Sequence, residues 1–158
     1  MRSARKAILA STALAALGLA AVAVAGEKGV PLPKDYRSWT HVRSMVVTDP
    51  DHGMYGFQDV YANRAALETL RGRSKVFKNG AVLVAAIYEP ITEDGMVKAG
   101  GKRRIAVKVK DAKATATSGW RYAVYDPAGR PIQIDPANCA GCHQGARDTD
   151  YVFARFVE

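Results

Sequence analysis

Residues 81–88 read Ala81-Val82-Leu83-Val84-Ala85-Ala86-Ile87-Tyr88, an unbroken apolar run. Successive side chains of a strand point to opposite faces, so a run without polar positions is typical of a strand covered on both sides. The preceding Lys78-Asn79-Gly80 is a tight-turn signal, from which such a strand can start. The run therefore predicts a central strand of a sheet with structure packed on each face.

Shorter strand patterns, separated by turns, flank this run. Strands are predicted over residues 41–47, 55–62, 105–109 and 120–125. In the third of these, Ala106 and Lys108 alternate with the apolar residues Ile105, Val107 and Val109, which indicates a half-buried strand. The polar, Gly-rich residues 92–102 predict a hairpin tip or a mobile loop.

Helical signals are few. Asn63 is a good N-cap for a helix over residues 64–71, which Gly72 would end. The C-terminal segment 151–156 is rich in aromatic residues and is predicted to pack back onto the core. The predicted fold is therefore mainly β (α+β), an antiparallel sheet with a few short helices. Residues 26–158 show no internal repeat and are predicted to form one domain.

Residues 1–25 have the pattern of a secretory signal peptide. Arg2, Arg5 and Lys6 precede an uncharged Ala/Leu-rich run, and the small residues Ala23-Val24-Ala25 provide a cleavage site. An uncleaved membrane anchor is the alternative, although the run is short for a spanning helix. The sequence predicts an exported, periplasmic protein without a stable membrane span after cleavage.

The charge is mildly basic and scattered. The chain has 23 Lys and Arg against 15 Asp and Glu, and residues 1–25 hold three of the basic ones, so the remainder carries a formal +5. The cluster Lys102-Arg103-Arg104 is too small for a nucleic-acid surface, which needs interleaved aromatics. The balance argues against a nucleic-acid partner. It is compatible with an acidic redox partner.

The two cysteines of the chain lie in Cys139-Ala140-Gly141-Cys142-His143. Cys-x-x-Cys-His is the attachment signature of c-type haem. The two thiols add to the haem vinyl groups as thioethers, and the adjacent histidine reaches the iron as an axial ligand. The motif predicts one covalent haem on Cys139 and Cys142, with His143 bound to the iron. A turn over 136–138 is predicted before the motif, which then opens a short helix.

Other interpretations of the cysteine pair are weaker. A thioredoxin-like redox motif needs a strand–helix context and usually an aromatic residue before its first cysteine. A structural zinc site needs four ligands, whereas only His41 and His52 remain, far away in the sequence. A vicinal disulfide would close too short a loop to stabilise the fold.

The sixth iron position decides what such a haem does. Electron-transfer cytochromes often fill it with methionine, and gas-binding or catalytic haems leave it open. The candidate ligands are Met45, Met54, Met96, His41 and His52, each of which has an ordinary core or turn interpretation. No candidate stands out from its surroundings.

From about residue 31 to its end, the chain resembles the cytochrome P-460 family and its relatives, the β-sheet cytochromes c′. The resemblance rests on the order and spacing of several segments rather than on any one of them. These segments are Pro33-Lys34-Asp35-Tyr36-Arg37-Ser38-Trp39, Val60-Tyr61-Ala62-Asn63, Phe77-Lys78-Asn79-Gly80-Ala81-Val82-Leu83-Val84, Gly119-Trp120, the haem motif and Asp150-Tyr151-Val152-Phe153-Ala154-Arg155-Phe156.

This resemblance implies a largely β fold, often a homodimer, with a five-coordinate haem c packed against the sheet near the C-terminus. Members that oxidise hydroxylamine carry a lysine cross-linked to the porphyrin, and this chain has Ala85 at that position. Those members also use a distal carboxylate shortly before a Val-Lys-Asp segment. Here Val109-Lys110-Asp111 matches the segment, and the carboxylate position falls on Ala106.

Two alanines supply no base for the proton removal that hydroxylamine oxidation requires. An apolar pocket instead suits neutral diatomics such as NO or CO, because a polar ligand would need hydrogen-bond donors there. Ala85, Ala106 and Phe57 are the candidates for the distal pocket, with Phe77 as a second aromatic. We expect a monohaem cytochrome that binds such gases or transfers single electrons, rather than an enzyme.

Two alternatives stay open at this point. A hydroxylamine- or NO-oxidising enzyme would need a base elsewhere, for which Glu89, Glu93 and Asp94 are candidates. A six-coordinate electron shuttle would need a methionine or histidine as sixth ligand.

Overall fold

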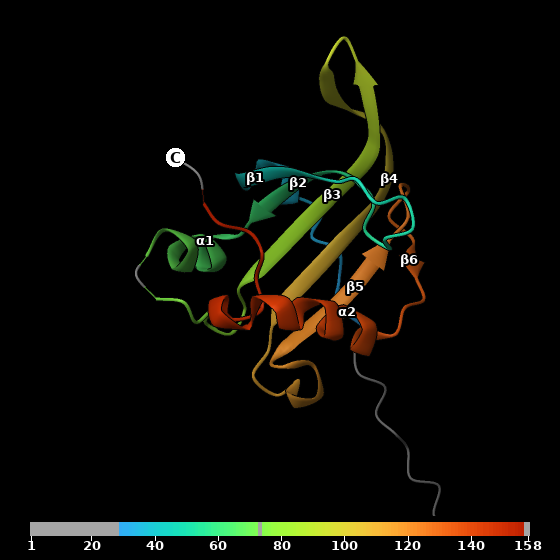
Figure 1. Cartoon of the computed structure of the whole chain (residues 1–158). Helices are drawn as coiled ribbons and strands as arrows, with labels where there is room; N and C mark the ends of the chain where they lie inside the picture. The colour runs from blue at the N-terminus through green and yellow to red at the C-terminus, as the bar shows by residue number, and fades with distance from the viewer. Residues whose placement is uncertain (1–28, 73, 157–158) are drawn as a thin grey trace, which may run out of the picture.

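The computed structural model describes residues 29–72 and 74–156, and the predicted signal peptide lies outside these residues. One antiparallel sheet, ordered β1-β2-β3-β4-β5-β6, organises the chain. Every strand follows its neighbour in sequence, so simple hairpin-like connections suffice (Figure 1). Its strands are β1 (Thr40–Val47), β2 (Gly56–Ala62), β3 (Val82–Glu93), β4 (Met96–Lys110), β5 (Trp120–Tyr125) and β6 (Pro131–Ile132).

The helices are short. The α-helices are α1 (Arg64–Arg71) and α2 (Pro136–His143), and the 3₁₀ helices are η1 (Tyr36–Ser38), η2 (Thr115–Thr117) and η3 (Gln144–Thr149). The predicted helix over residues 64–71 is confirmed, with the Asn63 side chain accepting from the backbone N–H of Ala66. The mainly β fold with few helices is likewise confirmed.

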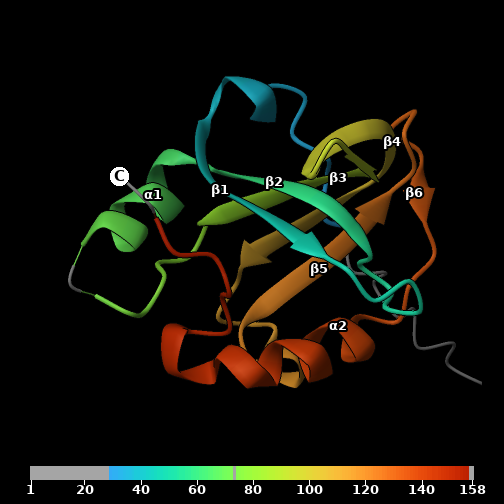
Figure 2. The same cartoon turned by 45° about the horizontal axis from the view of Figure 1, so that its top comes forward.

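The central strand is covered on both faces, as residues 81–88 predicted. Leu83 and Ile87 are buried on one face, and Val84 and Ala86 on the other. The first face packs against α1 and the C-terminal residues Val152 and Ala154. The second packs against Val30 and Tyr36 from the N-terminal segment. Figure 2 shows η1 above the sheet and α2 below it. We call the side that faces α2 the haem face.

The β3–β4 hairpin is longer than the sequence predicted. The strands continue through the polar residues 92–102 and meet at a turn of Asp94 and Gly95, both with positive φ. The hairpin then projects beyond the rest of the sheet (Figure 1). Sequence reasoning ended the strands too early because a two-stranded ribbon in solvent has no buried face to produce a hydrophobic alternation.

No helix among residues 29–72 and 74–156 has the length and apolar character needed to cross a membrane.

Candidate haem site

Helix α2 carries the Cys-x-x-Cys-His motif at its C-terminal end. The Asp135 side chain caps the helix by accepting from the backbone N–H of Ala137 at 2.9 Å, and Pro136 occupies the first position. Proline suits that position because its missing N–H would be unpaired anyway. The prediction that residues 136–138 form a turn and the motif opens the helix is therefore wrong: the helix starts three residues earlier.

The two cysteines are placed for a shared ligand. Cys139 and Cys142 are three residues apart on α2, a spacing that puts both side chains on one side of a helix. Both are free thiols, Cys139 half-buried and Cys142 exposed. They are not joined to each other, so the vicinal-disulfide interpretation finds no support. Among the described residues, no group of three His, Cys, Asp or Glu side chains is arranged to hold a bare metal ion.

The imidazole of His143 is held in one tautomer. Its Nδ1 lies 2.7 Å from the backbone carbonyl of Tyr151, which can only accept, so Nδ1 carries the proton. Nε2 keeps its lone pair and has no hydrogen-bond partner among the described residues. Burial, and then the nearby Lys108, lowers the pKa of His143 to about 4. The ring is therefore neutral at neutral pH, which is the form that binds a metal.

The carbonyl that holds His143 belongs to an unusual corner of the chain. Asp150 and Tyr151 both have positive φ, 52° and 63°, a conformation that non-glycine residues adopt only when the surroundings enforce it. Trp120 donates from Nε1 to the Asp150 carbonyl at 2.9 Å. The Asp150 carboxylate accepts from Lys110 Nζ at 2.6 Å and from the backbone N–H of Phe77 at 2.8 Å. These contacts fix the position of the next carbonyl.

Two aromatic rings flank His143. Tyr122 and Phe153 lie with ring centroids 5.4 and 5.1 Å from the imidazole. The predicted packing of the C-terminus onto the core is confirmed for the buried Val152 and for the partly buried Tyr151 and Phe156, whereas Phe153 is 48% exposed and faces the imidazole. The Tyr122 hydroxyl is buried and has no hydrogen-bond partner within residues 29–72 and 74–156, and burial raises its pKa.

Sequence reasoning missed Lys108. Its ammonium donates to the Tyr151 carbonyl at 2.5 Å and lies 4.1 Å from the centre of the Trp120 ring. The residue is only 8% exposed, although the alternation in β4 suggested a half-solvated strand. Burial lowers the pKa of Lys108 to about 7. The spacing along the strand could have placed Lys108 correctly. Lys108 lies two residues from Ala106, so the two side chains point to the same face.

Ala85 and Ala106 are brought together by the sheet. They are direct cross-strand partners in β3 and β4, and their row continues to Val60 on β2 and Val124 on β5. This row lies beside the row that contains Lys108 and Tyr122, which contact His143. Both alanines are only partly buried, so a strip of small apolar side chains remains accessible on the haem face.

Phe57 does not join these residues. It pairs with Tyr88, three positions along β2 from Val60, and an odd spacing places it on the opposite face. Its grouping with Ala85 and Ala106 therefore finds no support in the strand register. Phe77 is 5% exposed and contacts Trp120 edge to face, with ring centroids 5.4 Å apart, as expected of a core residue.

The candidate sixth ligands are widely dispersed. His41 lies on the opposite face, where its Nε2 is 3.3 Å from Asp59, and Met96 is exposed at the hairpin tip. His52 accepts at Nδ1 from the backbone N–H of Met54 in the loop between β1 and β2. Met45 alone among the five is placed on the haem face by strand register, because it pairs with Gln58.

The candidate bases of an oxidising enzyme are also away from this strip. Glu93 and Asp94 lie at the end of the projecting hairpin, where Glu93 pairs with Lys98. Glu89 forms an ion pair with Arg103 at 2.6 Å.

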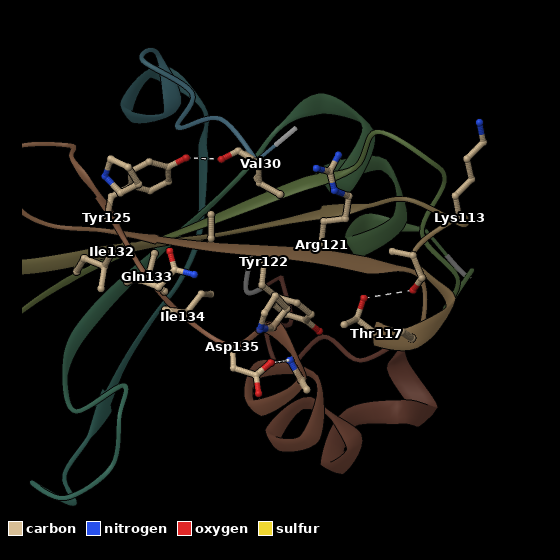
Figure 3. A pocket seen from close by; sticks show the side chains of 18 of the residues that line it. Val30, Lys113, Thr117, Arg121, Tyr122, Tyr125, Ile132, Gln133, Ile134 and Asp135 are labelled. Atoms are coloured by element: carbon tan, nitrogen blue, oxygen red, sulfur yellow. Dashed lines mark hydrogen bonds between the residues drawn. The ribbon is translucent and has the colours of Figure 1, made fainter. Parts of the chain in front are cut away.

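A cavity of about 730 Å³ adjoins the motif without containing it. It is bounded by β5, residues 131–137 and residues 113–117. Figure 3 shows Tyr122 projecting from β5 toward α2, with Asp135 at the start of that helix. The cavity shares Tyr122 and Val124 with the haem face, but none of Cys139, Cys142 and His143 lines it.

The described residues fit a c-type haem. Two thiols lie on one side of α2, the adjacent imidazole offers a free Nε2, and the Tyr122 hydroxyl is buried without a partner. The neighbouring apolar strip would cover a planar, largely apolar group. This donor set suits an iron porphyrin better than a bare ion.

No curated protein matches the chain in a direct sequence comparison. The family model described as Cytochrome P460 matches residues 33–154, which is most of the chain. Members of this family are c-type haem proteins and are typically exported. The match includes the sheet, both helices and the motif, and the chain belongs to the cytochrome P460 family.

Proposed function

We propose that this chain is an exported monohaem cytochrome with an open, apolar distal site that binds a neutral diatomic gas such as NO or CO. Cys139 and Cys142 would attach the haem and His143 would ligate its iron. When bound, the haem iron supplies an open coordination position and a one-electron redox couple. Single-electron transfer to a redox partner is therefore compatible with the same site.

The pairing of Ala85 with Ala106 carries this proposal. These residues stand side by side on the haem face, and their cross-strand neighbours are Val60 on β2 and Val124 on β5. These four side chains offer no proton acceptor and no hydrogen-bond donor, and the row reaches a polar side chain at Arg43 on β1, beyond Val60. A neutral diatomic loses little hydration on entering an apolar space, whereas an anionic or strongly polar ligand would lose hydrogen bonds to water without replacement.

The oxidising-enzyme alternative lacks a positioned base. Proton abstraction needs a group within hydrogen-bond reach of the substrate. Glu93 and Asp94 lie on the projecting hairpin, and Glu89 is held by Arg103. Gas binding is therefore the function that the geometry supports better.

The electron-shuttle alternative has one supporting observation. Met45 lies on the haem face, and its partly buried side chain packs against the core cluster that contains Val60 and Trp120. A thioether ligand from this position would close the sixth coordination site. The spectrum of the reduced protein distinguishes the two alternatives.

The test is absorption spectroscopy of the purified holo-protein, ferric and ferrous, with and without CO and NO. We expect a high-spin, five-coordinate ferrous spectrum that changes on adding either gas. A low-spin ferrous spectrum that ignores CO would reject gas binding in favour of the shuttle, and Met45→Leu should then restore CO binding. A strongly red-shifted ferrous Soret band would indicate a cross-linked porphyrin and favour the enzyme.

A homodimer and an acidic redox partner remain proposals. The family resemblance suggests the first, and the formal charge of +5 after cleavage suggests the second. Sedimentation of the holo-protein tests the dimer directly.

A further inference from the structure

One carbonyl oxygen serves two donors beside the proposed axial ligand. His143 Nδ1 lies 2.7 Å from the Tyr151 oxygen, and Lys108 Nζ donates to the same oxygen at 2.5 Å. The two nitrogens are 3.4 Å apart. Since Nδ1 carries a proton, it cannot accept from the lysine, so the contact between them is one of two donors facing a shared acceptor.

The arrangement is fixed from every side. Lys108 extends from β4 under the Trp120 ring, with the Tyr122 ring 5.4 Å from Nζ. The carbonyl follows the Asp150 corner, which Trp120, Lys110 and Phe77 hold by hydrogen bonds. The lysine therefore cannot easily turn away to solvent.

A carbonyl oxygen has two lone pairs and can accept two hydrogen bonds. Each of these hydrogen bonds withdraws electron density from the oxygen and so weakens the other. A hydrogen bond from the distal ring nitrogen of a metal-bound histidine raises the donor strength of the ligating nitrogen. A competing N–H donor at the same oxygen opposes this effect. The competition needs only an N–H on the lysine, and it acts in the direction of a weaker iron–histidine bond.

We propose that Lys108 is a positioning residue for the axial ligand, which limits how strongly the Tyr151 carbonyl polarises His143 and thereby sets the donor strength of its Nε2. This inference rests on the proposed ligation of the haem iron by His143. A weaker proximal donor favours the ferrous over the ferric state, because it stabilises the higher charge of the ferric iron less. Lys108 would thus tune the reduction potential without touching the haem iron.

The experiment compares holo-protein variants by resonance Raman spectroscopy of the ferrous state and by redox titration. Lys108→Met removes the competing donor but keeps much of the apolar volume. We expect the iron–histidine stretching band to move to higher frequency and the reduction potential to fall. Lys108→Arg restores N–H donors and should return both values toward those of the wild type.

Two further variants keep the test decisive. Lys113→Met removes a positive charge from an exposed position, and it should leave the Raman band unchanged. Lys108→Gln retains an N–H donor on a shorter side chain, so it should shift the band less than Lys108→Met. If Lys108→Met does not accumulate as holo-protein, Lys108→Leu, which also lacks an N–H donor, takes its place, and a band identical to that of the wild type would overturn the proposal.

Different results would refute the role of Lys108 and the ligation of the haem iron by His143. Absence of an iron–histidine band in the wild-type ferrous protein would contradict the proposed five-coordinate site itself. A wild-type band that stays in place in Lys108→Met, with an unchanged potential, would overturn the role of Lys108 and leave the ligation by His143 intact.

Discussion

Two neighbouring rows on the haem face have opposite chemistry. One row runs through Leu83, Lys108 and Tyr122, and it places an ammonium and a phenol against His143. The other is apolar through Val60, Ala85, Ala106 and Val124, and Arg43 on β1 follows beyond Val60. On β4, Lys108 belongs to the first row and Ala106, two residues away, belongs to the second. The side chains that contact the predicted axial ligand therefore lie next to the accessible apolar strip. A sheet can provide both because alternate residues of one strand share a face.

The first row depends on the Asp150 corner, and its disruption should cause the largest loss of stability. Lys110 and Asp150 form an ion pair whose side chains are 11% and 9% exposed. Asp150→Asn leaves the ammonium buried without its counter-ion, which should lower the free energy of unfolding by about 3 kcal/mol. Chemical denaturation of the holo-protein measures it. The control is Asp148→Asn, whose side chain is 91% exposed, and equal effects of the two variants would argue against a structural corner.

Lys108 should make the stability of the haem-free chain depend on pH. Burial lowers the pKa of Lys108 to about 7, below that of a lysine in the unfolded chain. Between these two values the unfolded state binds the extra proton, so stability rises from about pH 7 to pH 10. Lys108→Met should flatten this rise, which is on the order of 4 kcal/mol over three pH units. Parallel pH profiles of the two proteins would contradict the burial of a titrating amine.

In the second row, a change in side-chain volume should alter CO affinity more than a change in charge. Ala106→Leu adds bulk to the accessible strip, and displacing the new side chain should reduce CO affinity by roughly tenfold, about 1.4 kcal/mol. Equilibrium titration of the ferrous protein measures this loss. Ala99→Leu makes the same change on the exposed hairpin of the same strand and should have no effect. An unaltered affinity in Ala106→Leu would place the gas elsewhere.

Substitution of Tyr122, which lies where the two rows meet, should have the smallest effect. The buried hydroxyl of Tyr122 has no hydrogen-bond partner in the part of the chain that the structure describes, so Tyr122→Phe should stabilise the haem-free chain by up to about 1 kcal/mol. If haem supplies the missing partner, the same substitution should destabilise the holo-protein. Thermal unfolding of the haem-free chain and of the holo-protein measures both changes in stability. If the substitution changes stability in the same direction in both, the hydroxyl does not contact the haem.

Local signals explain which parts of the fold were predictable. The cap at Asn63, the turn at residues 78–80 and the apolar run of β3 each depend on neighbouring residues, and each is confirmed. The strand register makes Ala85 and Ala106 direct neighbours, and their role in a distal pocket stays a prediction. The motif itself was sufficient to select the helix that carries the cysteines, although not its starting residue.

The remaining features depend on partners that are distant in sequence. Lys108 is buried because the Asp150 corner and α2 fold over β4, and the alternation within β4 indicates only which face Lys108 lies on, not this contact. The resemblance to the β-sheet cytochromes c′ makes the aromatic Phe57 a candidate for the distal pocket, whereas the pairing of β2 with β3 directs it to the other face. The hairpin extends through polar residues because its strands pair only with each other.

Covalent attachment of haem to α2 is the property on which the proposed site depends most directly. The decisive measurement is the pyridine haemochrome spectrum of the protein after extraction with acidified acetone, in the wild type and in the Cys139→Ala/Cys142→Ala double variant. Thioether-linked haem resists this extraction, so the wild type should retain its haem and the double variant should lose it. Haem that stays covalently bound in the double variant would contradict the proposed site.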